Sequence, residues 1–230
     1  MKYKHIFFDL DRTLWDFEKS AEETFLEMFE VNELKKKGVA SFEEFRAVYK
    51  NHNDQLWAQY RKGEIEKEVL SVQRFVLTLA EFGINDMELA KKLGHEYITL
   101  SPLKTNLFPY THEILQYLQD KYELHLITNG FEEVQQVKVD ASDLRKYFKN
   151  LITSEEAGHK KPDYRIFQYA FDKANTNASE SIMIGDDLKG DILGAKAIGM
   201  DQIYVNFTNY EHCQVITHEV DSLYKIKEIL

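Results

Sequence analysis

Residues 5–14 of this 230-residue chain read His-Ile-Phe-Phe-Asp-Leu-Asp-Arg-Thr-Leu. The run at 5–8 is short and mostly apolar, and acids follow it directly, a pattern typical of a buried central strand in a parallel sheet. Comparable short runs recur further along the chain, at residues 124–128, 151–153, 181–185 and 202–205. We therefore expect a parallel sheet whose first strand ends just before Asp9.

Segments of helical length separate these runs. Residues 111–121 and 163–174 each place apolar side chains three and four positions apart, which predicts amphipathic helices. Alternating strands and helices are the signature of helices packed on both faces of a parallel sheet. The predicted fold class is α/β, a Rossmann-like doubly wound parallel sheet.

The stretch from 15 to 106 has a different pattern. Ser41 and Glu44 form a capping-box spacing before an apolar periodic segment, and residues 69–82 and 87–100 also have helical periodicity. No alternating strand pattern interrupts them. We expect an all-helical insert at 15–106, with residues 1–14 and 107–230 forming the α/β core.

The composition of the chain argues against several classes of partner and site. The chain carries 39 acidic and 29 basic side chains, a formal charge of −10, which disfavours nucleic-acid polymers and anionic membranes as partners. With Cys213 as its one cysteine, it can form no internal disulfide or Cys-based zinc site. It has no His-x-His or His-Glu-x-x-His pattern, no membrane-length apolar run and no signal-peptide pattern. We expect a cytoplasmic protein without zinc, either monomeric or weakly self-associating.

Asp9 and Asp11 follow the first predicted strand. Ligands of open α/β sheets bind beyond the carboxyl ends of the strands, so both carboxylates would face that crevice. Paired acids suit Mg²⁺, which prefers oxygen ligands, and also a division of labour between a nucleophile and a proton-transfer group. The alternative is a merely polar strand end.

Thr128 and Asn129 end another predicted strand and precede Gly130. This turn can present a hydroxyl and backbone N–H groups to a phosphoryl oxygen. The alternative is an ordinary Asn-Gly turn.

Lys161 adjoins Pro162 at the start of a predicted helix, where its ammonium could meet a developing phosphoryl charge. We favour it over Lys160 because it adjoins the proline. A solvated surface lysine is the alternative.

Asp186, Asp187 and Asp191 follow a fourth predicted strand. Asp186 is the natural metal ligand of this loop, and Gly185 permits close backbone approach. The alternative is that these acids lie at a helix N-terminus and complement its dipole. This would explain Asp187 or Asp191 singly better than it explains all three acids together.

These motifs occur in the order Asp-x-Asp-x-Thr, Thr at a strand end, Lys-Pro, and Gly-Asp-Asp-x-x-x-Asp. In that order the whole chain resembles the haloacid dehalogenase-like hydrolase superfamily, and the helical insert resembles that family's C1 cap. The opening residues are most similar to the pyrimidine 5′-nucleotidase (YjjG-like) group.

The resemblance implies a catalytic role for each acid of the first motif. Asp9 would be the nucleophile that forms an aspartyl-phosphate, and Asp11 would protonate the leaving alcohol and then activate water. Mg²⁺ would bind Asp9, the backbone carbonyl of Asp11, and Asp186. The second acid argues against haloacid dehalogenation, because true haloacid dehalogenases lack it.

The resemblance also implies roles for the other motifs. Thr128 and the Asn129 backbone would hold phosphoryl oxygens, and Lys161 would neutralise charge and orient Asp9. Asp191 would support Lys161 or the metal loop from behind, and Asp187 could share metal or water contacts.

The implied activity is Mg²⁺-dependent hydrolysis of a small phosphomonoester, with nucleoside 5′-monophosphates the first candidates. Alternatives are a phosphatase of small sugar or acid phosphates such as phosphoglycolate, a phosphomutase of the β-phosphoglucomutase type, and a non-catalytic phosphate-binding protein. Four aromatic residues are candidate substrate contacts, with core packing as their alternative role: Trp15, Phe17, Trp57 and Tyr60.

Overall fold

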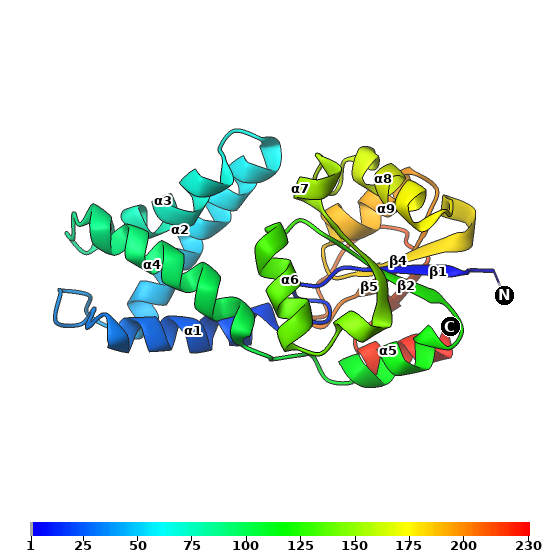
Figure 1. Ribbon diagram of the computed structural model, residues 1–230, viewed down its shortest axis with the longest axis horizontal. Helices are drawn as coiled ribbons and strands as arrows, with labels where there is room; N and C mark the ends of the chain where they lie inside the picture. The colour runs from blue at the N-terminus through cyan, green and yellow to red at the C-terminus, as the bar shows by residue number, and fades with distance from the viewer. Residues whose placement is uncertain (1) are drawn as a thin grey trace. The chain divides into compact units, whose positions relative to one another are not determined.

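Six parallel strands form one sheet in the order β3-β2-β1-β4-β5-β6 (Figure 1). The structure, a computed structural model, describes residues 2–230. The strands are β1 (His5–Phe8), β2 (Glu123–Thr128), β3 (Phe148–Thr153), β4 (Ser181–Gly185), β5 (Asp201–Val205) and β6 (His218–Val220). The predicted α/β class with a doubly wound parallel sheet is confirmed.

Helices cover both faces of this sheet. Those of the α/β unit are α5 (Thr111–Gln119), α6 (Glu132–Ala141), α7 (Ser154–Ala157), α8 (Tyr164–Ala174) and α9 (Gly194–Ala197). Shorter turns of 3-10 or π type are η2 (Arg145–Tyr147), η3 (Ala178–Glu180), η4 (Leu188–Leu193) and η5 (Leu223–Glu228).

Successive strand residues point to opposite faces and build two cores. Phe8 of β1 belongs to one apolar cluster, together with Ile114 of α5. Its neighbour Phe7 belongs to another, together with Phe167 of α8. Because both faces are buried, the strands are continuously apolar rather than alternating, and this is the pattern that revealed them in the sequence.

Strand prediction was accurate in the middle of the sheet and poorer at its edges. The bounds of β1 and β4 are as predicted, β2 and β5 begin one residue earlier, and β3 begins three residues earlier. The edge strand β6 was not predicted, because three residues with one buried apolar side chain carry no apolar run. Asp163 precedes α8 as its N-cap rather than forming its first residue.

The chain divides into two compact units, one made of the segment up to Phe17 with Thr105–Leu230, the other of Glu18–Lys104. The second unit is helical, with α1 (Phe17–Val31), α2 (Phe42–Lys62), α3 (Lys67–Glu81), α4 (Met87–Leu100) and the short η1 (Ser101–Leu103). At the start of α2, the Ser41 hydroxyl accepts a hydrogen bond from the Glu44 N–H, as the capping-box spacing predicts.

Aromatic rings fill the centre of the helical unit. Phe25 of α1 contacts rings from the other three helices, with centroids 4.4 Å from Tyr49, 6.4 Å from Phe75 and 4.7 Å from Tyr97. The Arg74 guanidinium lies 4.7 Å from the Tyr97 ring centroid and donates to Asn53 Oδ1. Phe25 therefore joins all four helices.

Within residues 2–230, no helix combines the length and the apolar character that crossing a bilayer requires.

Phe25→Ala is expected to destabilise the helical unit by about 3–5 kcal/mol, because it leaves a cavity among rings from four helices. The neighbouring Leu26 is 48% exposed, so Leu26→Ala should change stability by no more than about 0.5 kcal/mol. Urea unfolding followed by circular dichroism measures both variants. Equal, small effects of the two substitutions would contradict the central position of Phe25.

Candidate active site

Three neighbouring strands bring polar groups to their carboxyl ends. Asp9 follows β1, Thr128 ends β2, and Asp186 follows β4. The order β2-β1-β4 places Asp9 between the other two, and the Asp9 N–H donates to the Ile184 carbonyl, which extends the β1–β4 pairing to the site. The topology therefore brings motifs that are distant in the sequence into one cluster.

Lys161 is the cation of this cluster. Its Nζ lies 2.6 Å from Asp9 Oδ1 and 2.6 Å from Asp191 Oδ1, and donates to the Ile127 carbonyl at 2.8 Å. Lys161 Nζ donates hydrogen bonds to Asp9 and to the Ile127 carbonyl, whereas Asp191 Oδ1 balances its charge as an ion pair without a hydrogen bond. The side chains are 4%, 10% and 0% exposed for Lys161, Asp9 and Asp191 respectively.

Asn129 fixes the backbone of Lys161. Its Oδ1 accepts from the Lys161 N–H at 2.8 Å, and its Nδ2 donates to the Lys161 carbonyl at 3.0 Å. The side chain of Asn129 thus holds the lysine loop against the end of β2, a contact that the sequence did not predict.

Burial and charge have opposite effects on the pKa values of Lys161, Asp9 and Asp191. Burial lowers the pKa of Lys161, but the Asp191 and Asp9 carboxylates outweigh it and raise that pKa above its usual value. Burial raises the pKa of Asp9 and of Asp191, and the charge of Lys161 opposes the rise in both. Lys161 therefore remains protonated, and one ammonium is shared between two buried acids.

Asp186 is held by a residue of the first motif. Thr13 Oγ1 donates to Asp186 Oδ1 at 2.9 Å and accepts from the Asp186 N–H at 3.0 Å. Burial, followed by the nearby charge of Asp9, raises the pKa of Asp186 to about 7. Asp186 therefore lies in a site with more acid than its surroundings neutralise.

One carboxylate oxygen from each of Asp9, Asp186 and Asp191 lies within 4.8 Å of the others. Lys161 contacts one oxygen of Asp9, and Thr13 contacts one oxygen of Asp186. Asp191 Oδ1 forms an ion pair with Lys161 without a hydrogen bond, and Asp191 Oδ2 accepts from the Asp187 N–H. This excess of acid oxygens fits a hard dication such as Mg²⁺, and Asp9 and Asp186 are better placed than Asp191 to hold it.

Asp11 points toward α6 and is not part of that carboxylate group. Lys138 Nζ donates to its Oδ1, and Gln135 Nε2 donates to its Oδ2 at 3.0 Å. Lys138 is 3% exposed and its Nζ lies 3.9 Å from the Trp15 ring centroid. Burial lowers the pKa of Lys138 and Asp11 opposes that shift.

The sequence reasoning missed Gln135 and Lys138. A faint signal was present, since the two are three residues apart and therefore share a face of α6 with buried Val139. Polar residues on a buried helix face usually have partners. The sequence could not name Asp11 as that partner, 124 and 127 residues away.

The side chains of Thr128 and Asp187 each accept hydrogen bonds from backbone N–H groups two or three residues further along the chain. The Thr128 hydroxyl accepts from the Gly130 N–H at 3.1 Å and is almost fully buried. Asp187 Oδ1 accepts from the N–H groups of Lys189 and Gly190, which is the helix-end role that the sequence left open for it.

Gly185 has a steric role in this loop. A Cβ at this position would lie 2.2 Å from Asp191 Oδ2, so a larger residue would displace Asp191 from Lys161.

Of the four candidate aromatic contacts, Trp15 is fully buried in the core of the α/β unit. Tyr60 is also buried, in the helical unit, and packs edge to face with Trp57 at 5.4 Å between centroids. The packing alternative therefore describes Trp15 and Tyr60.

Comparison with known proteins identifies the family. A model of the haloacid dehalogenase-like hydrolases matches residues 3–199. Pyrimidine 5′-nucleotidase YjjG of Escherichia coli is 30% identical over all of this chain and 99% of its own length. A glyceraldehyde 3-phosphate phosphatase of Methanothermobacter thermautotrophicus is 34% identical over 67% of this chain and 72% of its own.

A solved structure agrees. The crystal structure of the HAD-hydrolase YfnB from Bacillus subtilis, bound to magnesium, superposes with a TM-score of 0.89 at 25% identity, covering 100% of this chain and 99% of that one. The resemblance found in the sequence, to the family and to its pyrimidine 5′-nucleotidase group, is confirmed.

Metal-free protein is expected to lose stability as the pH rises through about 7. The pKa of Asp186 is about 7 in the folded chain and about 3.9 when unfolded, so the folded state binds the extra proton between these values. That contribution is complete below pH 4, is lost as the pH rises through 7, and is at most about 4 kcal/mol.

Thermal unfolding from pH 5 to 8 with chelator measures this loss. Asp186→Asn should flatten the profile, whereas the exposed Asp120→Asn should not. Identical profiles for wild type and Asp186→Asn would contradict the assignment.

Proposed function

Because this chain belongs to the haloacid dehalogenase-like hydrolase family, we propose that it is an Mg²⁺-dependent phosphomonoesterase with Asp9 as nucleophile. The observation that carries the proposal is the position of Asp9, whose carboxylate is held by Lys161 Nζ at 2.6 Å beside Asp186 and Thr128. Mere binding of phosphate would not require a buried carboxylate at that point, since an anion is repelled by it.

The first half-reaction forms a bond from Asp9 to phosphorus. Lys161 contacts Oδ1, so we assign Oδ2 as the attacking oxygen. As the new O–P bond forms, the P–O bond to the alcohol breaks, and Asp11 gives a proton to the departing oxygen. Asp9 is left as an aspartyl-phosphate.

The second half-reaction releases phosphate. Asp11 takes a proton from water, the water oxygen bonds to phosphorus, and the Asp9–phosphorus bond breaks. Lys138 and Gln135 each donate a hydrogen bond to the Asp11 side chain, which orients the oxygens that would accept this proton. In the first half-reaction, where Asp11 acts as the acid, its side chain must carry a proton and turn from α6 toward the leaving oxygen.

The remaining groups would stabilise the negative charge of the phosphoryl group. Thr128 Oγ1 and the Asn129 N–H would donate to phosphoryl oxygens, and the Asn129 side chain keeps Lys161 in place. Mg²⁺ held by Asp9, Asp186 and the Asp11 carbonyl would supply positive charge to the transferring group. Phosphoryl transfer depends on such positioning and charge stabilisation. The magnesium-bound YfnB structure supports this assignment.

We propose nucleoside 5′-monophosphates as the substrate class, because the full-length relative YjjG is a pyrimidine 5′-nucleotidase. A small sugar phosphate is the second candidate, favoured by the glyceraldehyde 3-phosphate phosphatase that matches two thirds of the chain. We also propose that the helical unit is the cap domain that the sequence predicts. A phosphomutase would use the same core but return the phosphoryl group to substrate.

Phosphate release with Mg²⁺ from nucleoside, sugar and small-acid monophosphates is the test of this function. We expect release from pyrimidine nucleoside 5′-monophosphates and its loss when EDTA removes the metal. Release only from sugar phosphates would keep the mechanism and overturn the substrate class. No release from any ester, with transfer between sugar positions instead, would establish the mutase alternative, and release that persists in EDTA would overturn the metal role.

Asp9→Asn is expected to lower turnover by at least about 10³-fold, because the amide cannot attack phosphorus. The fold should persist, since Asn has the same shape and Lys161 keeps Asp191 as partner. Asp120→Asn, an exposed change at the end of α5, is the control and should retain full activity. A fully active Asp9→Asn protein would overturn the nucleophile assignment.

A further inference from the structure

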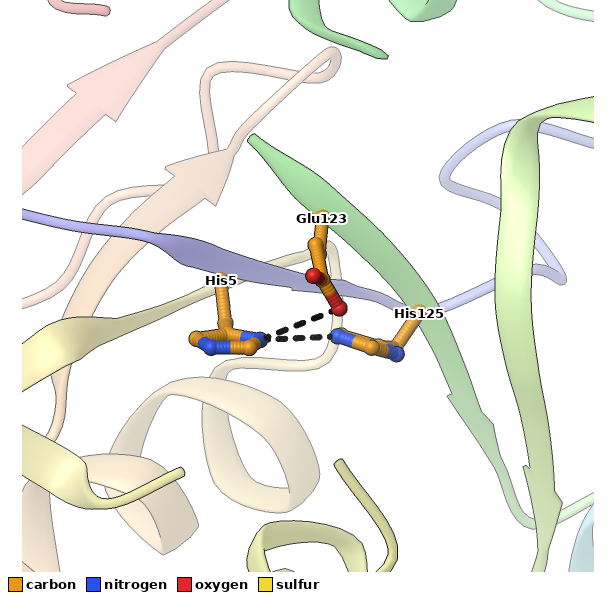
Figure 2. Close-up of side chains that lie close together, drawn as sticks. All are labelled: His5, Glu123 and His125. Atoms are coloured by element: carbon orange, nitrogen blue, oxygen red, sulfur yellow. Dashed lines mark hydrogen bonds and ion pairs between the residues drawn. The ribbon is translucent and has the colours of Figure 1, made fainter. Parts of the chain in front are cut away.

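A second group of chemically active side chains lies at the opposite end of the sheet. His5 is the first residue of β1, Glu123 is the first residue of β2, and His125 follows two positions later. The register pairs His5 with Glu123, so all three side chains lie on one face of the sheet. Figure 2 shows the two rings and the carboxylate converging on that face.

The ligand atoms are close enough to share one ion. His5 Nδ1 lies 3.1 Å from His125 Nε2 and 4.0 Å from Glu123 Oε2, and one donor atom of each residue lies within 4.8 Å of the others. Two nitrogens bound to the same tetrahedral zinc ion at about 2.0–2.1 Å are themselves about 3.3 Å apart. The nitrogen pair already has nearly that separation.

Packing fixes the orientation of the rings. The His125 side chain is fully buried and that of His5 is 11% exposed. The His125 ring stacks between two others, with centroids 5.4 Å from His5 and 4.8 Å from Phe7. Glu123, by contrast, has 57% of its side chain exposed and opens the group to solvent. The group is thus held in place by packing and has a route of entry.

Asn150 of β3 supports His125 from the other side. Its Nδ2 lies 3.0 Å from His125 Nδ1. Rotation of the amide presents Oδ1 to an Nδ1–H, and the Nε2 lone pair then faces His5. A group that holds the distal nitrogen of a ligating histidine in this way is a regular feature of metal sites.

The His125 imidazole is also in the form that binds metals. Burial, with the charges of His5 and Lys149, lowers the pKa of His125 to about 4, so its ring is neutral near pH 7, as ligation requires. The Glu123 carboxylate supplies negative charge to the group.

We propose that His5, Glu123 and His125 bind a transition-metal dication of the zinc class. Two nitrogens and one carboxylate favour such an ion over Mg²⁺, which prefers oxygen ligands. The site is independent of the proposed reaction, because His5 precedes Asp9 by four strand positions, about 13 Å along β1. Its role is structural, since the ion joins two central strands.

The sequence predicted no zinc because it holds no His-x-His or His-Glu-x-x-His pattern. The two histidines are 120 residues apart and meet only through the pairing of β1 with β2. A search for local spacing cannot find such a pair.

Calorimetric titration with Zn²⁺ tests the site, using full-length Asp186→Asn protein in excess Mg²⁺ so that the strand-end carboxylates do not contribute. We expect one Zn²⁺ per chain. In that background Glu123→Gln, an exposed change that preserves the fold, should weaken binding by at least about tenfold. His5→Gln and His125→Gln should abolish it, and Co²⁺ should give the absorption bands of a tetrahedral site that each variant loses.

Glu180→Gln is the matched control, because Glu180 is also an acid at the amino end of a strand, before β4, and pairs with Lys4. It should leave Zn²⁺ affinity unchanged. Equal affinity of Glu123→Gln and Glu180→Gln would overturn the proposal, as would the absence of Zn²⁺ binding tighter than millimolar. In either case the histidines form only a hydrogen-bonded pair.

Discussion

The ammonium of Lys161 between two buried carboxylates is the interaction on which the α/β unit depends. Removing one partner of a buried ion pair leaves an uncompensated charge and costs about 3–5 kcal/mol. Three chain segments must therefore arrive together: the end of β1 with Asp9, the end of β2 with the Ile127 carbonyl, and η4 with Asp191. Gly185 permits this meeting because any side chain there would collide with Asp191.

This interaction also leaves acid unneutralised. Lys161 is shared by Asp9 and Asp191, while Asp186 accepts a hydrogen bond from the Thr13 hydroxyl and has a pKa raised to about 7. A fold optimised for stability alone would replace such acids by neutral or apolar groups. An excess of buried acid at one point is stabilised by added positive charge, and this is the physical reason to expect a metal ion together with a phosphoryl group rather than a phosphoryl group alone.

Sequence reasoning succeeded where a signal is local. The apolar run of β1, the end of β2 at Thr128 and the glycine loop after β4 could all be predicted, and parallel topology alone brings their ends together. It failed where a partner is distant. Lys138 and Gln135 have no motif, because their relation to Asp11 exists only once α6 packs beside the first loop. The edge strand β6 lacked an apolar run for a similar reason, since an edge strand has fewer neighbours to bury it.

The two clusters at opposite ends of β1 contain different ligand types because one lies in loops and the other lies within strands. At the carboxyl end the strands pass into loops, and loop residues such as Asp9 and Asp186 can place several oxygens around one point. At the amino end the ligands lie within the strands themselves, so their spacing is set by the register of His5 with Glu123. Rigid strand positions suit imidazole nitrogens, whose direction is fixed by the ring, whereas loop positions suit carboxylates, because a loop can direct several oxygens to one point. An ion bound at the amino end would hold β1 and β2 in register without competing for the oxygens at the carboxyl end.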